Sequence, residues 1–260
     1  MHFYDAKTAA PRYEVPCSTK EGMRPARISD ARKYGWYPSV TEIMNVLAKP
    51  GLEYYKINQA ILAALTLPRI EGEPDDDLLK RIKQDAKEHS KQAAIKGEEI
   101  HDAVAAIYDG RGIYHFDATV RDCAEKVRNY LDAMGLHSFT AELPFVDPRY
   151  GYGGRVDLVD KSKQIILDLK TTETHFDRDG KEKKLNWPEH KTQLAAYGHA
   201  IFNREFDCDF RAINVYVDYS GHVTSHRWEL DYSDFVLFEN TLEIWKIKKN
   251  YWPEKLQDEA

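Results

Sequence analysis

Two acidic residues and a lysine near the middle of the chain have the types and spacing that chemistry requires. Asp157 lies in the apolar segment 153–159, and Asp168 and Lys170 lie in the apolar segment 165–171. Side chains alternate between the faces of a strand, so Asp168 and Lys170 should point the same way. A neighbouring strand can bring Asp157 beside them. We therefore expect two carboxylates and one ammonium group to converge at one end of a sheet.

This combination suits the hydrolysis of a phosphodiester. Two close carboxylates repel each other unless a cation lies between them, and such oxygen ligands suit Mg²⁺ or Mn²⁺. A metal of this kind lowers the pKa of a bound water and offsets charge on a phosphoryl transition state. Lys170 could orient or deprotonate that water, or stabilise the developing charge. The alternative is an exposed patch of ion pairs. The apolar neighbours of both acids weigh against that alternative, because an unpaired buried charge is costly.

Composition excludes several classes of protein. The chain has 260 residues, of which 42% are hydrophobic and 31% charged, enough to bury a core and too apolar for a disordered chain. Its three cysteines argue against a disulfide framework and against a four-thiolate zinc or iron–sulfur site. With a net charge of −6, any contact with nucleic acid must come from local basic patches or bound metal. We see no membrane span or signal peptide, so we expect a cytoplasmic protein.

Hydrophobic periodicity predicts helices before and after a group of strands. A capping box at Ser39 and Glu42 indicates a helix start. We expect further helices over 52–65, 76–109, 119–134, 188–203 and 233–250, and strands over 138–146, 153–159, 164–169, 211–219 and 222–229. This order predicts an α/β fold with a central mixed sheet flanked by helices and an N-terminal helical lobe.

Four motifs resemble those of one nuclease superfamily. They are Gly97 with His101, Gly154-Arg155-Val156-Asp157, Asp168-Leu169-Lys170-Thr171, and Gln193-Leu194-Ala195-Ala196-Tyr197. In this order they resemble the PD-(D/E)XK nucleases, and more narrowly the RecB-type exonuclease branch that includes phage exonucleases. The resemblance covers residues 95–220 and implies a restriction-endonuclease-like core. Together with the residue pattern, it divides the chain into an irregular arm (1–36), in which apolar clusters are few, a helical lobe that contributes His101 (37–115) and the nuclease core (116–260).

The resemblance also implies roles for individual residues. The implied metal ligands are His101, Asp157, Asp168 and the carbonyl of Leu169. The implied catalytic residues are Lys170, Gln193 and Tyr197, the last two as a Q-x-x-x-Y pair on one helix face. Members of the branch often have an acid at the position of Glu142, so this residue is a further candidate. Simpler readings stay open: a surface or core histidine at 101, a packing tyrosine at 197 and a surface acid at 142.

Basic residues near the proposed metal are candidate DNA contacts. The residues with side chains suited to phosphate are Arg155, Thr171, Lys181, Lys183, Lys184 and Lys191. The basic face of helix 76–109 could face phosphates or could simply be solvated. Trp245, Tyr251 and Trp252 lie near further lysines, and we expect them to pack in the core.

These observations predict a divalent-metal-dependent deoxyribonuclease, with an exonuclease in DNA recombination, repair or phage DNA processing as the leading hypothesis. Its expected cofactor is Mg²⁺, with Mn²⁺ able to substitute. We expect no iron–sulfur cluster and, without a phosphate-binding loop motif, no nucleotide cofactor. The expected partners are linear DNA ends, single- or double-stranded, with a single-strand annealing or binding protein and a second copy of the chain as candidates. The expected setting is the cytoplasm of a bacterial or phage-infected cell. The alternatives are a structure-specific endonuclease and a non-catalytic DNA-binding or assembly subunit.

Overall fold

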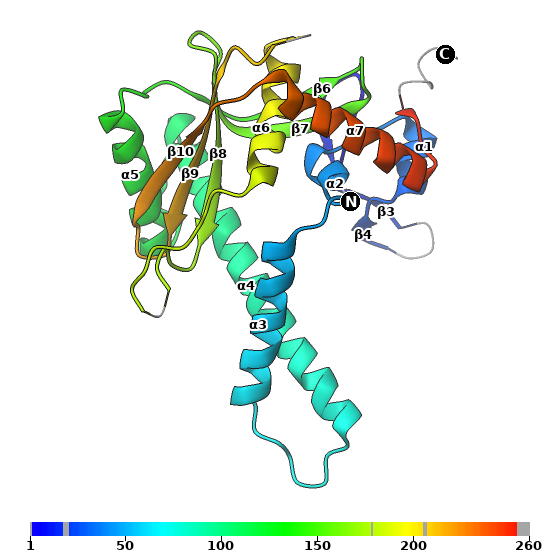
Figure 1. Cartoon of the computed structure of the whole chain (residues 1–260), viewed down its shortest axis with the longest axis vertical. Coiled ribbons are helices and arrows are strands. Elements are labelled where there is room, and N and C mark those ends of the chain that lie inside the picture. Colours follow the sequence, from blue (N-terminus) through cyan, green and yellow to red (C-terminus); the bar gives the residue numbers. More distant parts are fainter. Residues whose placement is uncertain (1, 18–20, 178, 205–206, 254–260) are drawn as a thin grey trace.

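A five-stranded mixed sheet forms the centre of the molecule. The computed structural model describes residues 2–17, 21–177, 179–204 and 207–253. The sheet has the order β10-β9-β8-β7-β6 (Figure 1). Its strands are β6 (Thr140–Asp147), β7 (Tyr152–Asp160), β8 (Ile165–Thr172), β9 (Arg211–Asp218) and β10 (Val223–Trp228). Only β8 and β9 pair in parallel, since helix α6 (Pro188–Ile201) connects them, and the other neighbours are antiparallel.

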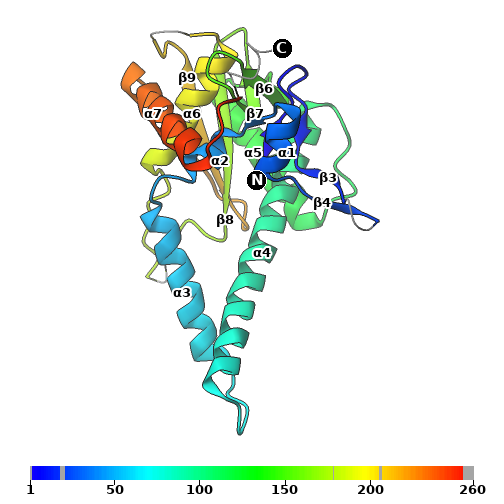
Figure 2. The same cartoon turned by 90° about the vertical axis from the view of Figure 1, so that its right-hand side faces the viewer.

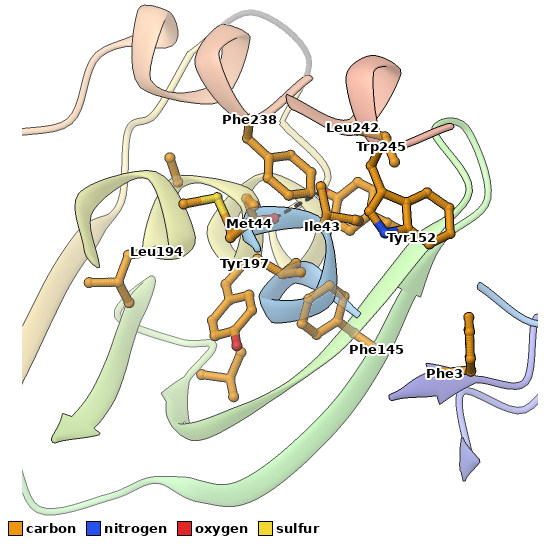
Figure 3. Close-up of a cluster of buried hydrophobic side chains, with 14 of the residues drawn as sticks. Phe3, Ile43, Met44, Phe145, Tyr152, Leu194, Tyr197, Phe238, Leu242 and Trp245 are labelled. Atoms are coloured by element: carbon orange, nitrogen blue, oxygen red, sulfur yellow. Dashed lines mark hydrogen bonds between the residues drawn. The ribbon is translucent and has the colours of Figure 1, made fainter. Parts of the chain in front are cut away.

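Helices cover both faces of this sheet and enclose two hydrophobic clusters. Helices α6 and α7 (Tyr232–Lys249) lie on one face, where Tyr152, Tyr197 and Trp245 belong to one cluster (Figure 3). Helix α5 (Ala118–Ala133) and the end of α4 (Asp75–Tyr108) cover the other face. The predicted α/β fold with a helix-flanked mixed sheet is confirmed, and it is consistent with a restriction-endonuclease-like core.

Helices α3 (Pro50–Thr66) and α4 form a long hairpin that projects away from the sheet (Figures 1 and 2). Only the last part of α4 packs into the core, where Gly97, Ile100, Ala103 and Val104 are buried. Gly97, which has no side chain, and the small Ala103 suit this close packing. The long helix predicted at 76–109 is confirmed. Among the described residues, no helix combines the length and apolar character needed to cross a membrane.

The N-terminal segment is more regular than the sequence indicated. Instead of an irregular arm, the described part of residues 1–36 forms β1 (Phe3–Tyr4), β2 (Pro11–Arg12), β3 (Glu14–Pro16), β4 (Met23–Pro25) and α1 (Ile28–Tyr34). Tertiary contacts explain the order. The buried Tyr251 hydroxyl donates to the carbonyls of Ala31 and Trp36, both at 2.9 Å. Trp245 is fully buried, so the predicted core role of Trp245 and Tyr251 is confirmed.

Two short elements connect this segment to the sheet. Strand β5 (Tyr37–Pro38) pairs with β1, and α2 (Val40–Met44) follows it. The Ser39 hydroxyl accepts a hydrogen bond from the Glu42 N–H at 3.0 Å, which confirms Ser39 as the predicted N-cap. Helix α2 packs against α6, α7 and β7. Helix α2 therefore lies on the same face of the sheet as α6 and α7, ahead of the α3–α4 hairpin.

Candidate active site

The site begins where the pairing of β7 and β8 ends. Backbone pairing joins Leu158 to Leu167 and continues toward the turn between the strands, but it stops before Asp157. Beyond that point the side chain of Asp157 replaces a backbone acceptor, and its Oδ2 accepts a hydrogen bond from the Leu169 N–H at 2.6 Å. The carboxylate thus occupies the gap that opens between two diverging strands. In this position the Asp157 carboxylate lies close to Asp168, as the sequence predicted.

A change of face in β6 and β7 turns Glu142 toward the same gap. Ala141 and its partner Leu158 pack in the cluster under α4 and α5. Leu143 and its partner Val156 lie two residues along each strand, yet they pack on the opposite face. Residues two apart normally share a face of a strand. Glu142 has a φ of 50°, a left-handed conformation that non-glycine residues seldom adopt, and this distorts β6 at the site.

Helix α4 brings His101 to these carboxylates. The helix crosses the end of β8 at Gly97, where an added Cβ would lie 2.5 Å from the Thr171 hydroxyl oxygen. This close approach explains why the position next to the site is glycine. One helical turn later, His101 Nδ1 lies 3.5 Å from Asp157 Oδ1. The structure therefore places His101 beside an acid of the site.

The side chains of His101, Glu142 and Asp157 each offer one ligand atom, and these atoms lie within 4.8 Å of one another. One imidazole nitrogen and two carboxylate oxygens form a donor set that suits Mg²⁺ or Mn²⁺. Burial and the charge of Asp157 raise the pKa of Glu142 to about 7. Burial is the largest influence on Asp157 and disfavours its charged form, but His101, Lys170 and the Leu169 N–H together lower the pKa of Asp157. Two acids that repel each other around one histidine fit a divalent cation.

Asp168 and Lys170 form the second half of the site. Lys170 Nζ lies 2.7 Å from Asp168 Oδ2, so the two side chains share a face of β8 as the alternation predicted. Lys170 Nζ also donates to Gln193 Oε1 at 3.3 Å. Asp168 is 4% exposed, and a buried carboxylate of this kind needs several donors to remain charged.

Helix α6 supplies some of these donors through the predicted Gln193–Tyr197 pair. Gln193 Nε2 lies 3.2 Å from Asp168 Oδ1 and 2.8 Å from the Tyr197 hydroxyl. The Tyr197 ring packs edge-to-face on Phe145, with ring centroids 5.4 Å apart. Tyr197 therefore acts as a buried packing residue and also as a contact that fixes Gln193.

Asn214 on β9 contacts the site as well, and sequence reasoning missed it. Its Nδ2 donates to Asp168 Oδ2 at 2.7 Å, and its Oδ1 accepts from Trp228 Nε1 at 2.7 Å. Asn214 is fully buried. The available signal was an asparagine between the apolar residues Ile213 and Val215 of the predicted strand 211–219. Whether this asparagine reaches Asp168 depends on the register of two strands that are far apart in sequence.

The expected DNA contacts fall into different places. Arg155 forms an ion pair with Glu142 at 2.5 Å, and Thr171 lies against Gly97. Lys191 Nζ lies 2.9 Å from Asp234 Oδ2 on α7, so a contact with DNA would have to break this pair. The other lysines belong to the segment between β8 and α6, which contains Lys181, Lys183 and Lys184.

Comparison with known proteins gives only distant similarities. No family model and no curated protein matches the sequence. A phage-related exonuclease from Haemophilus somnus 129PT is 11% identical, with a TM-score of 0.35 over 63% of this chain and 83% of its own. The crystal structure of SSO0001 is 18% identical, with a TM-score of 0.30 over 60% of this chain and 83% of its own.

Proposed function

We propose that the protein is a divalent-metal-dependent nuclease that hydrolyses phosphodiester bonds of DNA. The observation that supports the proposal is the meeting of two groups of side chains at the divergence of β7 and β8. His101, Glu142 and Asp157 present converging ligand atoms, and the Asp168–Lys170 pair lies beside them. Metal ligands next to a positioned amine are the components that phosphodiester hydrolysis requires.

The residues divide between holding the metal and placing the reacting groups. His101, Glu142 and Asp157 would hold Mg²⁺ or Mn²⁺, and Asp168 and the Leu169 carbonyl remain proposed further ligands. A bound divalent ion would lower the pKa of a water and neutralise phosphate charge. An imidazole ligand is softer than the all-oxygen set typical of Mg²⁺, which supports the use of Mn²⁺ as well.

Lys170 is the proposed catalytic residue. Its ammonium group is held between Asp168 Oδ2 at 2.7 Å and Gln193 Oε1 at 3.3 Å. Two acceptors fix the position of this ammonium group before substrate binds. It can therefore orient a nucleophile or offset charge on the phosphate without a further loss of side-chain conformational freedom. Gln193 is itself held by Tyr197. In this proposal α6 positions the lysine and β8 carries it.

The proposed mode is exonucleolytic cleavage of DNA ends, with endonucleolytic cleavage as an outcome that the test separates. Purified protein is incubated with end-labelled linear DNA and with covalently closed circular DNA, each in Mg²⁺ or in EDTA. We expect nucleotides or short oligomers from linear DNA only, and only with the metal. Nicking of the circles would assign an endonuclease instead. Binding without cleavage of either DNA would contradict the nuclease proposal.

A further inference from the structure

A cavity of about 480 Å³ adjoins the proposed active site where the α3–α4 hairpin meets the sheet. The end of β8 contributes Thr171 and Thr172, which directly follow Lys170 in the chain. The other walls come from α3 with Tyr55 and Lys56, from α4, and from the segment after β8 that contains Lys183 and Lys184. The Thr171 side chain also lies against Gly97, one helical turn before His101, so the cavity lies next to the side of the proposed site that α4 forms.

The size of the cavity favours a single strand over a duplex. Pockets of 300–1,000 Å³ take groups the size of a drug molecule, which is the scale of one or two nucleotides. A cavity of about 480 Å³ has room for this much of one strand, whereas a double helix would have to place two strands and their paired bases in the same space. The contact of Trp187 with Gly51 joins that segment to the start of α3, since an added Cβ at Gly51 would lie 3.3 Å from the ring.

The charge and aromatic character of the walls suit the two parts of a nucleotide. Lys56, Lys183 and Lys184 outnumber the single acid of the lining, Glu173, although the chain as a whole carries a net charge of −6. Lysines track the phosphates of a single strand, and aromatic rings stack on its bases without regard to sequence. Tyr55 and Tyr219 line the cavity and can supply these rings.

One of the two aromatic walls is anchored. The Tyr219 hydroxyl donates to the Ala93 carbonyl at 3.0 Å, which fixes its ring against α4. Lys96 Nζ lies over one face of this ring, 4.5 Å from its centroid, so a base would stack on the other face. A ring held in this way loses little conformational freedom when a base stacks on it.

We infer that this cavity binds a single strand of DNA, one or two nucleotides at a time, and delivers it to the proposed metal site. The inference rests on the proposed function for the direction of delivery, but the binding itself does not require cleavage. It makes single-stranded DNA, or the frayed end of a duplex, the substrate of the site.

The test measures binding of a labelled oligothymidylate and of a blunt hairpin duplex to the full chain in EDTA, where no cleavage occurs. We expect the single strand to bind more tightly. Replacing both Lys183→Ala and Lys184→Ala should weaken its binding on the order of tenfold and reduce the slope of log affinity against log salt by about 1.4. The matched control is Lys161→Ala with Lys163→Ala, which removes the same charge at the opposite end of β8.

A second measurement keeps the test decisive if a variant folds poorly. An oligomer containing 5-iodouracil is crosslinked to the wild-type protein, and the attached peptides should contain Tyr55 or Tyr219. Tyr55→Leu should weaken binding, and Tyr54→Leu should not, because Tyr54 is 68% exposed and lies outside the cavity lining. Crosslinks confined to other surfaces, equal affinity for the duplex, or wild-type affinity in the double lysine variant would each overturn the inference. Lysine-dependent binding without cleavage in Mg²⁺ would support the cavity and contradict only the nuclease proposal.

Discussion

Asn214 on β9 lies directly opposite Asp168 in the parallel register with β8, and its amide nitrogen donates to Asp168 Oδ2 at 2.7 Å. The same amide is fixed on its other side by Trp228 Nε1. Asp168 Oδ2 therefore receives one donor from Asn214 and another from Lys170. Neutral and charged donors on one oxygen hold the carboxylate in a single rotamer. This support comes from a strand that carries no other residue of the proposed site.

We expect Asn214→Ala to lower nuclease activity about 10- to 100-fold, since loss of a residue that orients a metal-site carboxylate has effects of this size. The Mg²⁺ concentration for half-maximal activity should rise as well, which a purely structural defect would not cause. Trp228→Phe keeps the ring and removes only its N–H, so a smaller change is expected. Activity titrated against Mg²⁺ checks both variants. An unchanged metal dependence in Asn214→Ala would contradict the positioning role.

Lys170→Ala and Asp168→Asn should each reduce cleavage by a factor of about 10² to 10⁴ or more while the fold stays intact, because a positioned acid–base or charge-stabilising group contributes this much. Activity on end-labelled DNA and the thermal midpoint are measured together. Lys163→Ala, in the turn before β8, is the matched control for a lost lysine charge. Turnover at the wild-type rate in either site variant would discard the assignment.

The sequence predicted the parts of the site that lie close together along the chain. Alternation within one strand places Asp168 and Lys170 on the same face, and helical spacing places Gln193 next to Tyr197. Both are consequences of regular backbone geometry, which holds wherever the element forms. The helices and central strands were predictable for the same reason.

The remainder depends on tertiary contacts that periodicity does not encode. The left-handed conformation of Glu142 turns β6 at the site, and it breaks the alternation on which a strand prediction depends. The contact of Asn214 with Asp168 depends on the register of β9 against β8, which the sequence pattern does not give. The order in the N-terminal segment was missed because it comes from contacts with distant residues, such as Tyr251.

Gly97→Ala should impair activity more than stability. The new methyl group would lie 2.5 Å from the Thr171 hydroxyl oxygen, so the side chain of Thr171, the residue after Lys170, must move. Alanine in place of glycine inside a helix favours the helix by up to about 1 kcal/mol, which offsets part of the packing cost. We therefore expect a small change in the thermal midpoint and a clear loss of cleavage.

The rescue variant for this contact is Thr171→Ala, which removes the opposing hydroxyl group. The double variant should regain activity relative to Gly97→Ala alone, a non-additive result expected for residues in contact. Cleavage rates and thermal midpoints of the wild type, both single variants and the double variant complete the cycle. Strict additivity of the two effects on cleavage would contradict the crowding of β8 by α4.

Glu142→Gln should stabilise the metal-free protein at alkaline pH. The pKa of Glu142 is raised to about 7 by burial and by Asp157, whereas an unfolded chain titrates glutamate near 4.3. The folded state therefore binds the proton more tightly, and the stability that this proton contributes is complete below about pH 4 and disappears as the pH rises through 7. Glutamine does not ionise, so the variant avoids this loss, with an expected gain of about 1–3 kcal/mol at pH 8.

The measurement is the thermal midpoint from pH 4 to pH 8 in EDTA, for the wild type and the variant. The difference between them should be absent at pH 4, grow as the pH rises from about 4 to about 7, and change little above that. Glu125→Gln, on the exposed side of α5, is the matched control and should follow the wild type. Adding Mg²⁺ or Mn²⁺ at pH 8 should then stabilise the wild type more than Glu142→Gln, because a ligand that binds only the folded state adds stability where its site is complete. If the metal stabilises both proteins equally, Glu142 is not a ligand and the converging triad does not hold the cation.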